Sequence, residues 1–151
     1  MNNQPYTNPA PQSAAPAYAI HLKTNRSLLK FILLGIITFG IYPIVVMCVL
    51  SGNINTVAQR YDGKSTMNWF LAMILGGITL GIVPIVWYHR VSNRIGNNLT
   101  ARGIPYHVSA GTFWGWGVFG ALLFGIGPFV YMHKLLKGMN LICEDFNRKG
   151  F

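Results

Sequence analysis

A four-residue segment, Gly-Ile-x-Pro, recurs three times inside apolar stretches of this chain, at 40–43, 81–84 and 125–128. Proline lacks the N–H that a helix interior needs and is tolerated best in the first turn of a helix, whereas glycine favours helix ends. Each copy therefore predicts a helix, a break and a second helix. The predicted helices end near Phe39, Leu80 and Phe124, and new ones start near Pro43, Pro84 and Pro128.

The residues around the breaks, whose glycines are Gly40, Gly81 and Gly125, match in register. A second glycine stands five residues before each of them, at Gly35, Gly76 and Gly120, and successive break prolines are 41 and 44 residues apart. Self-similarity at a nearly fixed period is typical of repeat architectures. We therefore divide the chain into a disordered, proline-rich tail at 1–25 and three membrane repeats at 26–64, 65–106 and 107–151, which together form one membrane domain, 26–151.

The composition indicates that these repeats lie in a membrane. Hydrophobic residues make up 52% of the chain and charged residues only 10%, against about 25% charged residues in a typical soluble domain. The 12 Lys and Arg residues outnumber three acids, and all of these cations lie outside the apolar runs 31–50, 69–88 and 113–132. A basic excess could also indicate nucleic-acid binding, but long uncharged runs have no use in such a module. We predict an all-α integral membrane protein without a nucleic-acid partner.

An amphipathic segment follows each apolar run. Met47, Leu50, Ile54, Val57 and Tyr61 are separated by steps of three and four residues, which places them on one helical face, and similar stripes follow the other two runs. Basic residues accompany the stripes: Arg60, Arg90, Arg94, Lys134 and Lys137. We predict that the amphipathic helices lie in the membrane interface, with these side chains on anionic headgroups.

Two arrangements of each repeat stay open at this point. As a bent transmembrane span, the helix from Trp69 to Trp87 rises about 27 Å, close to the hydrocarbon thickness of about 30 Å. As shallow hairpins, which we favour, the repeats gather all 12 cations on one side of the membrane, whereas three spans divide them evenly and give no orientation. If the repeats are hairpins, the side that carries the cations is expected to be cytoplasmic, and the N-terminal tail lies on that side too.

The stretch Thr38-Phe39-Gly40-Ile41-Tyr42 resembles the repeated Thr-x-Gly-Ile-Tyr unit of small bacterial integral-membrane proteins, the domain-of-unknown-function 4234 type. The resemblance extends over residues 27–149, although Val83 and Gly127 replace the tyrosine in the other two copies. It implies a bacterial inner-membrane location. It implies no established activity and no catalytic residues.

One candidate metal site follows from the repeat register. Five residues after the three break prolines stand Cys48, His89 and His133, and a pseudo-threefold arrangement would bring together one thiolate and two imidazoles, which suit zinc, copper or haem iron. The same positions mark the boundary between apolar and polar sequence, where histidine beside Arg90 or Lys134 needs no metal. We therefore predict no cofactor and keep the metal site as the alternative.

No catalytic motif occurs in the sequence: there is no nucleophile elbow, phosphate-binding loop or metalloprotease helix. We expect a non-enzymatic membrane module that shapes or scaffolds the bilayer, with homo-oligomers as one form. The alternatives are a small oligomeric transporter or pore subunit, and an accessory subunit of a larger membrane complex. Two Gly-x-x-x-Gly pairs, Gly77 with Gly81 and Gly111 with Gly115, predict close helix packing, first within the chain and then between copies.

Overall fold

The computed structural model describes residues 21–149, apart from the side chains of Arg60 and Phe124, and this part of the chain is helical without any strand. Three long helices are α2 (Ile41–Asp62), α4 (Ile82–Ala101) and α7 (Gly127–Lys149). Shorter apolar segments precede them: α1 (Leu28–Ile37), α3 (Trp69–Ile78) and, before α7, a run of α5 (Ala110–Thr112), the π-helix η1 (Phe113–Phe119) and α6 (Gly120–Phe124). The predicted all-α class is confirmed.

The long helices begin within two residues of the break prolines, as predicted. The sharp turn, however, lies before the proline and not at it. Phe39 and Gly40 have φ values of 50° and 87°, and Leu80 and Gly81 have φ values of 51° and 87°. The chain therefore changes direction through a pair of left-handed residues, and the proline follows in the first turn of the new helix, where its missing N–H has no intrahelical partner to lose.

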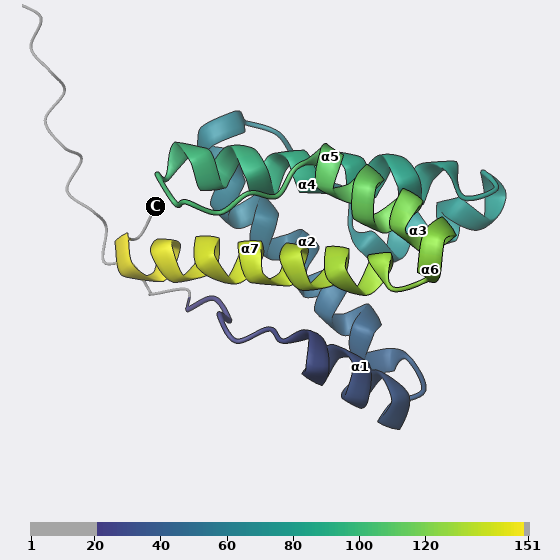
Figure 1. Cartoon of the computed structure of the whole chain (residues 1–151). Coiled ribbons are helices and arrows are strands. Elements are labelled where there is room, and N and C mark those ends of the chain that lie inside the picture. Colours follow the sequence, from purple (N-terminus) through teal and green to yellow (C-terminus); the bar gives the residue numbers. More distant parts are fainter. Residues whose placement is uncertain (1–20, 150–151) are drawn as a thin grey trace, which may run out of the picture.

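The chain turns back on itself at each break. A Cβ atom built on Gly76 would lie only 2.5 Å from the ring of Pro84, and the same contact recurs at 3.0 Å between Gly35 and Pro43. Farther from the turn, the Trp69 indole donates a hydrogen bond of 3.0 Å to the Tyr88 hydroxyl across the α3–α4 pair. Each pair of segments is therefore a hairpin, and in Figure 1 the three turns lie towards the right of the molecule and the far ends of α2, α4 and α7 towards the left.

The apolar stripes of the long helices pack on one another, which corrects the prediction that they lie against lipid. The side chains that meet are fully buried at 0% exposure: Leu50, Ile54 and Val57 of α2, Val91, Ile95 and Leu99 of α4, and Leu135, Met139 and Ile142 of α7. Three amphipathic helices can bury their stripes completely against each other, and this removes more apolar surface from water than one-sided contact with an interface. The distal halves of the three helices thus form a small bundle with a core of its own.

Asparagine side chains join successive hairpins. Asn55 of α2 donates from Nδ2 to the Thr66 carbonyl (2.8 Å) and accepts from the Thr66 N–H (2.6 Å), and Asn140 of α7 holds Arg26 in the same way (2.7 and 3.2 Å). An amide side chain can pair with both backbone groups of one residue because it carries a donor and an acceptor side by side. These contacts fasten the segment before the second hairpin to the first hairpin, and the segment before the first hairpin to the third.

The segment 21–27 packs along α7, although the sequence predicted that residues up to 25 belong to a disordered tail. Leu22 is buried, and its N–H and carbonyl both pair with the Asn147 side chain at 2.9 and 2.8 Å. The ordered unit therefore begins earlier than the predicted boundary at 26. The part of the predicted tail at 1–20 lies outside the described residues.

Candidate functional site

The turns of the hairpins expose large apolar side chains almost completely. Phe39 is 97% exposed, Leu80 is 94% exposed and, in the third hairpin, Leu122 is 80% exposed. Further exposed apolar residues continue down the outer faces of the hairpins, including Ile36, Ile37, Ile41, Ile78, Ile82, Leu123 and Ile126. A contiguous apolar surface of this kind marks contact with a membrane or with another protein. We refer to these three turns, 36–41, 78–82 and 122–126, as the apolar tips.

Two of the apolar tips place a bulky side chain where glycine would be easier to accommodate. Phe39 and Leu80 both adopt the left-handed backbone conformation at φ near 50°, which costs a non-glycine residue about 1–2 kcal/mol because Cβ crowds the following carbonyl. Packing inside the protein does not offset this cost, since both side chains are nearly fully exposed. Strained residues of this kind cluster at functional positions, so the free energy lost at the tips points to a contact outside the chain.

Threonine side chains support the same two turns. The Thr38 hydroxyl donates to the Leu34 carbonyl (2.5 Å) and accepts from the Tyr42 N–H (2.9 Å). Thr79 makes the equivalent pair of bonds to Leu75 (2.8 Å) and Val83 (3.3 Å). The hydroxyl therefore satisfies one group at the end of the first helix and one at the start of the next. Both threonines stand two residues before the break glycine, but nothing in that spacing indicates this bridging role.

Cations stand at a similar distance behind each tip. Lys30 precedes Phe39 by nine residues, Arg90 follows Ile82 by eight, and Lys134 follows Ile126 by eight. At 1.5 Å per helical residue these separations are about 12–14 Å, close to half of the bilayer hydrocarbon thickness of about 30 Å. No charged residue lies between the cations and the tips in any of the three hairpins.

Aromatic residues gather near the cations. Tyr88 stacks on Phe113 with ring centroids 5.8 Å apart, and Tyr131 meets both rings edge to face. On the outer side, the half-exposed Trp114 donates a hydrogen bond of 3.1 Å to Nδ1 of His89, which adjoins Arg90. Tryptophan and tyrosine at this level resemble the aromatic belt of proteins at a membrane–water interface.

The residues predicted to bind headgroups do not share one environment. Arg90 and Lys137 are exposed and Lys134 is half-buried, so these side chains can meet a charged surface. Arg94 instead lies inside the protein: Nε and Nη2 bind the two Asp62 carboxylate oxygens at 2.7 and 3.0 Å, and Nη1 binds Asn55 at 2.8 Å. The side chain of Arg60 lies outside the described part of the molecule.

A second buried pair ties α4 to α7. Arg102 donates to Oδ2 of Asp145 at 2.9 Å, and Lys149 binds the other carboxylate oxygen at 2.9 Å. Asp62 and Asp145, two of the three acidic side chains, therefore pair internally with Arg94 of α4 and with Arg102 at its C-terminal end, and Glu144 is the exposed acidic side chain. The surface outside the core is more uniformly basic than the net charge of +9 alone suggests.

The structure does not bring Cys48, His89 and His133 together. Cys48 donates to the Asn68 side-chain oxygen at 3.5 Å, His89 accepts from Trp114, and His133 is exposed on α7. Across residues 21–149 no group of three His, Cys, Asp or Glu side chains is placed to hold a metal ion. The equivalent repeat positions lie at the outer surface of the helices and not around the central axis.

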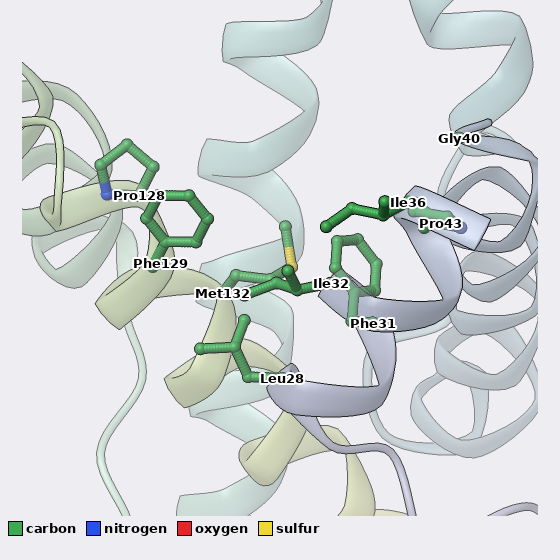
Figure 2. A pocket seen from close by; sticks show the side chains of 10 residues that line it. Leu28, Phe31, Ile32, Ile36, Gly40, Pro43, Pro128, Phe129 and Met132 are labelled. Carbon is green, nitrogen blue, oxygen red and sulfur yellow. The ribbon is translucent and has the colours of Figure 1, made fainter. Parts of the chain in front are cut away.

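An apolar groove lies between the first and third hairpins (Figure 2). Its volume is about 310 Å³, and it is lined by Leu28, Phe31, Ile32, Gly35, Ile36, Gly40, Pro43, Pro128, Phe129 and Met132. The groove extends from the first turn of α1 to the apolar tips. The sequence did not predict it, because its two walls are about 100 residues apart in the chain and repeat register does not show how tightly two hairpins pack.

Among the described helices, α2 alone is long and apolar enough to cross a bilayer, over Ile41–Gln59, and 33% of that window is buried inside the molecule. This supports association with a membrane. Its exposed side chains Ile41, Val45 and Val49 follow one another at four-residue steps and form the outer face of the first hairpin.

Residues 26–97 match the model of a family described as a domain of unknown function (DUF4234). The match confirms the resemblance over the first hairpin, α3 and most of α4, and it does not include residues 98–149, to which the resemblance was expected to extend. No curated protein and no solved structure matches the chain.

Proposed function

We propose that this protein is a non-enzymatic membrane module whose three apolar tips enter one leaflet of a bilayer and deform it. The observation that carries the proposal is the nearly complete exposure of Phe39 and Leu80 in strained backbone at the ends of two hairpins. In hydrocarbon these side chains contribute favourable transfer free energy, about 1.5–3 kcal/mol each, which exceeds the cost of the left-handed backbone.

The level of the cations supports insertion to the middle of the bilayer and no farther. With Lys30, Arg90 and Lys134 at the headgroups, the tips reach about 12–14 Å into the hydrocarbon, which is one leaflet. Three hairpins displace lipid tails in that leaflet only, so the bilayer is expected to bend. By the positive-inside rule, the bundle at the other end of the molecule faces the cytoplasm, and several copies side by side add their effects.

The role of the distal halves of α2, α4 and α7 differs from the one that the amphipathic pattern predicted. Because their apolar stripes face each other, they form a bundle on the aqueous side that holds the three hairpins at fixed positions. A headgroup contact then involves Arg90, Lys134 and Lys137, and not Arg94, which holds Asp62 and Asn55. The module therefore acts as a rigid three-pronged wedge.

Vesicle binding by the Leu80→Asp variant tests the proposal. Aspartate tolerates the left-handed backbone at this position, so the fold persists, but a carboxylate in hydrocarbon costs about 3 kcal/mol and lowers partitioning into phosphatidylglycerol vesicles about a hundredfold. Asn97→Asp introduces the same group at an exposed position of α4 in the bundle and is the matched control, with partitioning close to that of the unmodified protein. Electron microscopy of the vesicles measures deformation.

Two results would contradict the proposal. One is equal partitioning of the Leu80→Asp and Asn97→Asp variants, because the tip would then lie outside the hydrocarbon. The other is an unchanged size and shape of anionic vesicles at high loading with the unmodified protein, because the inserted hairpins would then leave the bilayer undeformed.

A further inference from the structure

The three contacts between neighbouring hairpins are not filled alike. Tyr88, four residues after its break proline, stacks on Phe113, fifteen residues before the next break proline, and these rings fill the space between the second and third hairpins. Between the third and first hairpins, the same two repeat positions hold Met132 and Leu28. Both line the apolar groove. Leu28 and Met132 thus stand where the contact between the second and third hairpins has two aromatic rings. Because these two side chains fill less space than the rings, the groove stays open between the third and first hairpins.

The shape of the groove fits an extended hydrocarbon chain. It begins at Leu28, in the first turn of α1, and reaches Gly40 in the first apolar tip and Pro128 just after the third (Figure 2). Gly35 and Gly40 contribute backbone without side chains to its wall. If the tips point to the bilayer midplane, the groove runs in the direction of the acyl chains of the surrounding leaflet.

The Leu28 end of the groove favours a negative group. Lys23 and Lys30 flank this end in the sequence and are exposed, and no carboxylate occurs from His21 to Tyr61. Arg26 lies between them, where its Nη1 donates to the Lys23 carbonyl at 2.6 Å and to Asn140 at 3.4 Å. The helix α1 begins here, and the Ser27 side chain does not cap it. Its first N–H groups therefore add partial positive charge to that of the three cations.

We propose that the groove holds one acyl chain of an anionic phospholipid taken from the bilayer, with the headgroup at the start of α1. The inference depends on the proposed membrane insertion, which places bilayer lipid beside the groove. A peptide or a second copy of the chain fits less well, since an inserted backbone needs hydrogen-bond partners and every lining side chain is apolar. The bound acyl chain fills the space between the third and first hairpins, as Tyr88 and Phe113 fill the space between the second and third.

The test transfers the aromatic pair to the groove. The double variant Leu28→Phe, Met132→Tyr fills the Leu28 end, and Leu29→Phe, at a neighbouring position that is 66% exposed, is the control. Each full-length protein is extracted from vesicles of equal phosphatidylglycerol and phosphatidylcholine content, and retained lipid is counted by native mass spectrometry. We expect the unmodified protein and the control to retain one phosphatidylglycerol, and the double variant to bind it at least about tenfold more weakly.

Vesicle flotation of the same proteins separates the two proposals. Unchanged flotation with loss of the retained lipid in the double variant supports the inference. Normal flotation of the unmodified protein without any retained lipid, or equal retention by the double variant and the control, overturns the inference and leaves the membrane wedge intact. Failure of the unmodified protein to float overturns both. Ile32→Phe, which narrows the middle of the groove, replaces the double variant if that protein does not fold.

Discussion

Arg94 shows how one residue can change meaning between sequence and structure. In the sequence it is a cation beside an amphipathic stripe, which predicts a headgroup contact. In the fold its guanidinium is buried and binds the two carboxylate oxygens of Asp62, the Asn55 side chain and the Lys64 carbonyl. Five donors in a rigid plane suit such a junction of several acceptors. Arg94 thus fixes the loop between the first and second hairpins to α4.

The ion pair between Asp62 and Arg94 makes the stability of the bundle depend on pH. The hydrogen bonds from Arg94 lower the pKa of Asp62, against the opposing effect of its burial. Because the pKa is lower in the folded state, the contribution to stability is present above the unfolded value of about 3.9 and is lost as the pH falls from there through the folded pKa. We expect the thermal unfolding midpoint in detergent to drop over this interval, measured by circular dichroism.

The Asp62→Asn variant isolates this effect. It is less stable than the unmodified protein by about 1–3 kcal/mol at pH 7 because it leaves a buried arginine without its carboxylate, and its stability falls less as the pH drops below about 4. Glu144→Gln removes the same charge from an exposed position and serves as the control. An Asp62→Asn protein that is as stable at pH 7 as the control contradicts a stabilising role for the pair.

At the scale of elements, the glycine preceding each break determines how closely a hairpin closes. The sequence predicted close packing at Gly77 and Gly81, on the pattern of spaced glycines. The structure has no atom within 4 Å of a Cβ at either position, whereas Gly76 contacts Pro84. A spacing pattern cannot identify the partner, because the break rotates the second helix relative to the first, and that rotation depends on the φ values of the two tip residues.

Adjacent glycines provide a matched pair for this contact. In Gly76→Ala the new methyl group overlaps the Pro84 ring, which is rigid, so the hairpin must open at an expected cost of about 1–3 kcal/mol. In Gly77→Ala the methyl group meets open space, and alanine favours the helix by up to about 1 kcal/mol. The midpoints of thermal unfolding in detergent should therefore move in opposite directions. Equal shifts would show that the close Gly76–Pro84 approach does not determine stability.

The sequence predicted the helical segments well and their packing poorly. The glycine and proline positions located the helix boundaries to within two residues, since backbone restrictions act locally. The stripes were also identified correctly, for example Leu50, Ile54 and Val57. The surface on which the stripes pack was not identified, because an amphipathic helix presents the same pattern whether it lies on lipid or on two other helices. The asparagine contacts were missed for a related reason: a polar side chain on a helix does not show which distant backbone it binds.

On the scale of the whole molecule, the three hairpins form a closed set of contacts. Asn55 and Asn140 stand at the same repeat position, twelve residues after the break proline, and the second unit has Gly96 there. The Val108 carbonyl oxygen lies where a Gly96 Cβ would be, so the backbone itself occupies the space of the missing side chain. The long helix of each hairpin therefore contacts the segment that leads into the next hairpin, and α7 contacts the segment that leads into the first.

This closure orients all three hairpins in the same direction, and it leads to the prediction that distinguishes hairpins from spans. Single cysteines at Lys64 and Ala101, both exposed and each near the end of one repeat, lie on the same side of the membrane if the units are hairpins. If the units are bent spans, they lie on opposite sides. The parent protein carries Cys48→Ser and Cys143→Ala.

Labelling intact cells with a membrane-impermeant maleimide, before and after permeabilisation, gives the measurement. We expect Lys64→Cys and Ala101→Cys to be protected to the same extent in intact cells and to react equally after permeabilisation, because the bundle holds both positions on the cytoplasmic side. Cysteines at Phe39 and Leu80 are the internal control: with the tips in hydrocarbon, where a thiol rarely ionises, both should react slowly in either state. Reaction of only one of the two bundle positions in intact cells would mean that an odd number of membrane crossings separates them, and the one-leaflet wedge would then be wrong.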